Sequence, residues 1–105
     1  MVEVAPQFEQ KDNLGTTFIS VSTVGTSAVQ IPASAGNDIS DFILRCNVDN
    51  SPITKRLLWS YDNINYFTLA PGESAFRAPR QGIKQIYIKG SIASVSYEFE
   101  CNREP

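Results

Sequence analysis

The sequence predicts an all-β fold, an antiparallel β-sandwich of jelly-roll-like form with about eight short strands. Turn-forming groups of Gly, Pro, Asn and Asp recur about every 8–12 residues, a spacing that leaves little room for helices. The segments between these turns are rich in Val, Ile, Thr, Phe and Tyr, which suit a pleated, half-buried surface. Several segments also alternate apolar and polar residues, as expected for a strand with one buried face.

The predicted strands follow one another between the turns. They comprise residues 17–21, 27–31, 42–48, 57–62, 66–70, 74–77, 85–89 and 93–102. We expect the first two to pair around Gly25. The three strands between residues 57 and 77 are joined by short loops, which favours antiparallel hairpins over parallel pairing. The strand at 85–89 is expected to turn at Gly90 into the last strand.

Two strands show the inward-facing pattern most clearly. The expected inward residues are Phe42, Leu44, Cys46 and Val48 in one strand and Ala93, Val95, Tyr97, Phe99 and Cys101 in the other. Both cysteines therefore point into the core. They lack the Cys-x-x-Cys spacing of zinc and redox motifs. Buried free thiols are the default prediction because disulfides are rare in reducing compartments, and a disulfide between the two is the alternative.

Composition excludes several classes of function. A chain of 105 residues fits a single core and leaves no room for a second domain. With no histidine, the usual Ser or Cys triad is excluded, and we expect neither enzymatic activity nor a cofactor. Nine Lys and Arg against eleven Asp and Glu give no basic footprint for nucleic acid. No stretch reaches the ~20 apolar residues that span a bilayer, and no secretion signal is present, so we expect synthesis in a cytoplasm and no membrane partner.

The first 14 residues differ in composition from the rest. Residues 1–14 are mostly polar with spaced apolar positions, among them Val4 and Phe8, and we expect them to form an N-terminal arm preceding a β-sandwich domain at residues 15–105. The arm is a frayed terminus, a partner-binding segment anchored by Val4 and Phe8, or an added edge strand of its own sheet.

Two groups of oxygen-bearing side chains are candidates for chemical sites. Glu98 and Glu100 lie about 7 Å apart on one strand face, but they alternate with serines on the polar face, and a solvated face is the better interpretation. Oxygen ligands for calcium are offered by residues 62–65 and by Asp49 and Asn50, yet such residues at turns ordinarily bond their own backbone. No metal site is predicted.

Aromatic and basic residues are concentrated in the second half of the chain. Tyr61, Tyr66 and Tyr87 are candidates for a sugar-stacking platform, with core packing and interface anchoring as alternatives. Arg77, Arg80 and Lys84 form a predicted basic loop. In a self-assembling protein this loop would meet the acidic face of a neighbour, whereas the alternative is a loop kept soluble by its charge.

Three stretches resemble small virion proteins of tailed bacteriophages. Residues 58–74 contain the patterns S-x-D-x-x-N and L-x-P-G-E-S, residues 85–91 contain I-Y-I-K-G, and residues 24–32 fit the same arrangement. The resemblance extends over about residues 18–100 and includes no catalytic motif. It implies a β-sandwich used as a building block, either a capsid decoration (cement) protein or a head-fibre, neck or tail component.

The leading prediction is therefore a non-enzymatic virion protein that decorates and stabilises the head shell. Its expected partners are the major capsid protein or other virion proteins and further copies of itself, most simply as a trimer, assembled in the host bacterial cytoplasm. Val4, Phe8, Arg77, Arg80 and Lys84 are the predicted interface residues. The alternative from a different class is a carbohydrate- or receptor-binding module at a fibre or tail tip that uses Tyr61, Tyr66 or Tyr87.

Overall fold

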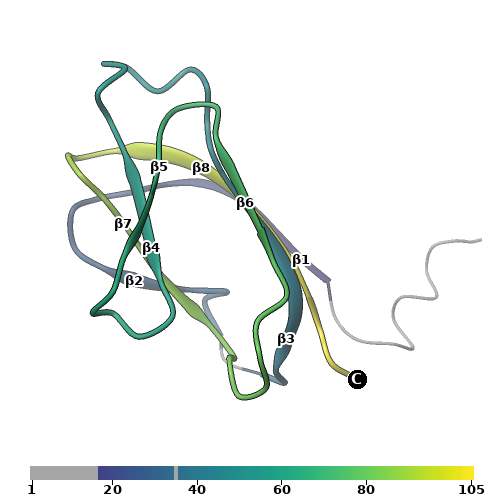
Figure 1. Cartoon of the computed structure of the whole chain (residues 1–105). Helices are drawn as coiled ribbons and strands as arrows, with labels where there is room; N and C mark the ends of the chain where they lie inside the picture. Colours follow the sequence, from purple (N-terminus) through teal and green to yellow (C-terminus); the bar gives the residue numbers. More distant parts are fainter. Residues whose placement is uncertain (1–16, 35) are drawn as a thin grey trace, which may run out of the picture.

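Two four-stranded antiparallel sheets make up the structure, a computed structural model that describes residues 17–34 and 36–105 (Figure 1). The predicted arm, with Val4 and Phe8, lies outside the described residues. The eight strands are β1 (Thr17–Val24), β2 (Val29–Ile31), β3 (Ile39–Cys46), β4 (Leu57–Ser60), β5 (Phe67–Leu69), β6 (Ser74–Arg77), β7 (Ile86–Gly90) and β8 (Val95–Arg103).

The strand order is that of a jelly roll. One sheet, here called the β1 sheet, has the order β1-β8-β3-β6, and the other, the β2 sheet, has the order β2-β7-β4-β5. The chain crosses between the sheets at most of its connections, as in the double Greek key of jelly rolls. The all-β sandwich predicted from the sequence, with about eight strands, is confirmed.

The predicted pairing of the first two strands is wrong. β1 pairs with β8, placing Val21 opposite Glu98, and β2 pairs with β7, placing Gln30 opposite Tyr87. The turn at Gly25 is a crossing between the sheets, and its carbonyl accepts a hydrogen bond of 2.7 Å from the Gly90 N–H. Turn-forming residues show where the chain changes direction. Which strand pairs with which depends on how the two sheets bury their apolar faces against each other.

The predicted hairpins between residues 57 and 77 are half correct. β4 and β5 pair as a hairpin, with Leu57 opposite Leu69. β6 instead joins the other sheet and pairs with β3, with Leu44 opposite Ala75. The connection through Gly72, which has a φ of 91°, therefore carries the chain from one sheet to the other.

The core lies between the two sheets and follows the predicted alternation in β3 and β8. Its largest fully buried side chains are Trp59, Phe42, Phe99, Ile39, Leu44, Leu57, Ile86, Ile88 and Val95. Trp59 and Phe42 meet edge to face, with ring centroids 5.5 Å apart. The prediction fails at the strand ends, since Val48 is 79% exposed and Ala93 is also exposed. Both lie outside the paired strands, where the alternation no longer applies.

Both cysteines are buried thiols with no disulfide between them, as predicted by default. Their strands are neighbours, but Cys46 lies opposite Tyr97 and Cys101 lies opposite Phe42. That register separates the two thiols by four positions along the ladder, about 13 Å, which is too far for a disulfide. Burial raises the pKa of the Cys46 thiol, and the Asn50 side-chain amide donates to its sulfur at 3.4 Å.

In the described part of the chain, no helix could cross a membrane.

Candidate protein interaction site

A pocket of about 310 Å³ lies beside the connection between β6 and β7. Its walls come from Tyr61, which directly follows β4, and from Ala78, Pro79, Arg80 and Ile83 of the connection. We call it the loop pocket. Its lining combines apolar surface with one guanidinium group, which suits a ligand with an apolar body and a negative charge.

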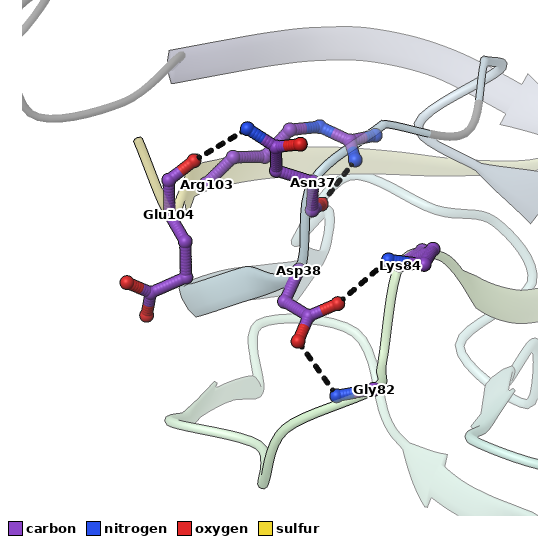
Figure 2. Close-up of polar contacts among 6 residues, drawn as sticks. All are labelled: Asn37, Asp38, Gly82, Lys84, Arg103 and Glu104. Carbon is purple, nitrogen blue, oxygen red and sulfur yellow. Dashed lines mark hydrogen bonds and ion pairs between the residues drawn. The ribbon is translucent and has the colours of Figure 1, made fainter.

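The loop that forms the pocket is fixed to the start of β3. The Ile39 N–H donates to the Ile83 carbonyl at 2.7 Å. The Asp38 carboxylate accepts from the Gly82 N–H and from Lys84 Nζ, both at 2.8 Å (Figure 2). Gly82 has a φ of 98°, a conformation that other residues rarely adopt. These contacts keep the β6–β7 loop in one arrangement.

Asp38 belongs to a larger polar group that closes this end of the sandwich. Arg103 Nη1 donates to the Asn37 carbonyl at 2.6 Å, and the Asn37 side-chain amide donates to the Glu104 carbonyl at 3.1 Å (Figure 2). The Glu104 N–H in turn donates to the Asp38 carbonyl at 2.7 Å. We call this group the end latch; its members are Asn37, Asp38, Gly82, Lys84, Arg103 and Glu104. It joins the β2–β3 loop, the β6–β7 loop and the end of β8.

A second guanidinium group stands beside the pocket. The Arg77 guanidinium lies 5.5 Å from the centroid of the Trp59 ring, a cation–π contact. Burial raises the pKa of Tyr61, and the charge of Arg77 opposes that rise. Among the described residues, the ion pairs are Arg45–Glu98 and Lys84–Asp38, and no carboxylate lies within 4 Å of Arg77 or Arg80. Two cations beside one partly apolar pocket make this a candidate site for an acidic segment of a protein.

The structure separates the predicted basic loop into two roles. Arg77 and Arg80 are exposed beside the loop pocket. Lys84 instead forms a 2.8 Å ion pair with Asp38 and holds the loop in place. The predicted interface residues Val4 and Phe8 lie in the part of the chain that the structure does not describe.

The three tyrosines considered for sugar binding do not share one site. Tyr61 lines the loop pocket. Tyr87 alternates with the buried Ile86 and Ile88 and therefore faces outward from the β2 sheet. Tyr66 lies near Tyr87. Burial raises the pKa of Tyr66, and the charges of Tyr87 and Asp62 add to the rise. The Tyr66 hydroxyl donates to the Asn63 side chain.

The two remaining groups considered as chemical sites have structural roles. Glu98 lies 3.5 Å from the Arg45 guanidinium on the outer face of the β1 sheet. The Asp62 carboxylate accepts from the Ser60 hydroxyl and from the backbone N–H groups of Ile64 and Asn65 at 2.8–2.9 Å, which confirms the turn interpretation. These hydrogen bonds hold the pKa of Asp62 well below its usual range. Within residues 17–34 and 36–105, no cluster of metal-ligating side chains occurs.

Apolar side chains exposed on the edge strands were not predicted from the sequence. The edge strands are β1 and β6 in one sheet and β2 and β5 in the other. Among the residues whose side chains the structure describes, each of these strands includes a large apolar side chain open to solvent: Val21 at 67%, Phe76 at 66%, Val29 at 44% and Phe67 at 48% exposed. The signal was present as Val and Phe within predicted strands, but exposure depends on which strands lie at an edge, and strand order is not encoded locally.

Comparison with known proteins yields similarity of fold alone. No family model and no curated protein matches the chain. A solved structure described as "Bacillus endospore appendages form a novel family of disulfide-linked pili" aligns with 87% of this chain and 88% of its own, with a TM-score of 0.54 and 16% sequence identity. The chain is therefore similar in fold to a protein of those appendages.

Proposed function

We propose that this protein is a non-enzymatic structural subunit that works by packing against other protein subunits in a larger assembly. The observation that carries the proposal is the exposed apolar side chain on each of the four edge strands. Edge strands usually carry charges, prolines or bulges that prevent association. An edge with an exposed Val or Phe instead favours lateral packing or strand addition by a partner.

Within this class we favour a capsid decoration protein of a tailed bacteriophage. The support is the resemblance of residues 58–74 and 85–91 to small virion proteins. The expected partners are the major capsid protein and further copies of the chain, as a trimer. The similarity in fold to a pilus protein supports the coarser idea of a subunit that builds a surface structure.

The proposed assembly is non-covalent. The similar structure comes from pili described as disulfide-linked, but the two cysteines of this chain are buried and form no disulfide with each other. A thiol in the core does not reach a neighbouring subunit unless the sandwich opens. Contacts between folded surfaces are therefore the basis of the proposed assembly.

The proposal predicts that charges on the edge strands weaken assembly. Val21→Lys and Phe76→Lys place an ammonium group on β1 and β6 at positions that are already exposed, so the fold should persist. We expect each variant to lower association about tenfold or more, as for an apolar interface anchor, measured by sedimentation velocity of the full chain.

A matched control uses Ile64→Lys. Ile64 is 79% exposed but lies in the turn between β4 and β5 and not on an edge strand. Its association should match that of the unchanged chain. Equal association of all three variants and the unchanged chain would contradict the role of the edges.

A further inference from the structure

The loop pocket has the lining of a peptide-binding site. Tyr61, Pro79 and Ile83 give it apolar walls, and Arg80 adds a cation. Arg77 lies close enough for its charge to act on Tyr61. An occupant that matches this surface carries an aromatic or aliphatic side chain next to one or more carboxylates.

The chain itself contains such a segment. Residues 1–14 have three acidic residues, Glu3, Glu9 and Asp12, against the single cation Lys11. Phe8 is followed directly by Glu9, so an aromatic ring and a carboxylate are adjacent. The segment and the pocket are thus complementary in charge and in apolar character.

The segment is attached at the same end of the sandwich as the pocket. Thr17 pairs with Asn102, and Asn102 pairs with Asp41 of β3. The next residue of β3, Phe42, pairs with Arg77 of β6. Three strand spacings therefore separate Thr17 from the pocket side, roughly 15 Å. The nine residue steps from Phe8 to Thr17 extend to about 30 Å at most, so length permits docking.

The end latch lies between Thr17 and the loop pocket of the same subunit, at the ends of β8 and β3. There the Asn37 carbonyl accepts from Arg103, and the Asn37 side-chain amide donates to the Glu104 carbonyl (Figure 2). Asp38 then joins the β2–β3 loop to Gly82 and Lys84 of the pocket loop.

We propose that the loop pocket binds the N-terminal segment of a second copy of this chain, with the Phe8 ring in the pocket and the Glu9 carboxylate against Arg80. This inference rests on the proposed function, because it names one contact through which the subunits assemble. It also gives Arg77 and Arg80 a common task, to hold an acidic segment.

Photo-cross-linking of the full chain tests the contact. Phe8 is replaced by p-benzoylphenylalanine, and unlabelled and ¹⁵N-labelled copies are mixed in equal amounts before irradiation. We expect mass spectrometry to find residue 8 joined to the peptide that contains residues 77–84, with mixed-label pairs making up half of the products. Cross-links confined to one copy, cross-links elsewhere, or none would each overturn the inference.

Charge variants provide the control for the ionic contact. Arg80→Glu reverses an exposed charge and should lower the cross-link yield about fivefold or more, and Glu9→Arg in the same chain should restore it. Lys55→Glu, at the opposite end of the sandwich where Lys55 bonds the Ser94 carbonyl, should leave the yield unchanged. Equal yields for both single variants would overturn the pairing with Arg80.

Sedimentation of the same samples separates this inference from the proposed function. Copies that associate but cross-link at another surface contradict only the use of the loop pocket. Copies that remain monomeric at every concentration, with no cross-link, contradict the proposed assembly as well.

Discussion

At the scale of single residues, Asp38 shows how one carboxylate organises a site. It accepts hydrogen bonds from the Gly82 N–H and Lys84 Nζ, and its own carbonyl accepts from the Glu104 N–H. Three segments far apart in the sequence therefore meet at one residue. Lys84 and Gly82 lower the pKa of the Asp38 carboxyl below its ordinary value.

This pKa shift predicts a pH-dependent contribution to stability. Because the pKa of Asp38 is lower in the folded than in the unfolded chain, its stabilisation is complete above the ordinary Asp pKa and is lost as the pH falls through the folded-state pKa. Asp38→Asn should lower the free energy of unfolding at neutral pH, and the difference from the unchanged chain should shrink below about pH 4. Urea unfolding across this pH range measures both.

The control for this prediction is Asp49→Asn, which alters an exposed aspartate of the β3–β4 loop. It should leave the pH dependence of stability unchanged. A stability difference for Asp38→Asn that stays constant down to the lowest pH would contradict a role for its ionised form.

At the scale of elements, the sequence predicts strands better than strand partners. Alternation placed the inward faces of β3 and β8 correctly because it depends only on the pleat of the strand itself. The residues of β1, β2 and β6 do not by themselves predict which strands they pair with. Their pairing depends on the whole sandwich, in which the apolar faces of the two sheets must pack against each other. The candidate site is predictable to a similar extent. The charges of Arg77 and Arg80 predict them as interface residues, but their proximity to Tyr61 results from the packing of separate strands.

The end of β7 provides a direct test of these crossing connections. A Cβ on Gly90 would lie 2.6 Å from the Ile92 carbonyl oxygen and 2.7 Å from Val95 Cγ2. Gly90→Ala should therefore force the β7–β8 connection apart and destabilise the protein by about 2 kcal/mol, as overpacking does in cores. Equilibrium urea unfolding gives the value.

The matched control is Gly25→Ala at the partner position. The Gly25 carbonyl bonds the Gly90 N–H, yet a Cβ on Gly25 would meet nothing within 4 Å. Its effect should stay within about 0.5 kcal/mol. Equal destabilisation by the two substitutions would contradict the close approach at Gly90.

At the scale of the whole molecule, the jelly roll presents four sheet edges and the loop pocket to its surroundings. The β1 sheet ends at β1 and β6, the β2 sheet ends at β2 and β5, and each of these strands carries an exposed apolar side chain. The end latch fixes the loop pocket relative to the β1 sheet. The proposed assembly therefore has two kinds of surface to use, the four edges and the pocket.

We propose that this chain is a structural subunit on the head shell of a phage particle. Negative-stain electron microscopy of purified particles, labelled with an antibody against the chain, tests it most directly. We expect antibody label distributed over the head shell. Label confined to one vertex or to the tail, or no label although the antibody binds the isolated chain, would contradict this location.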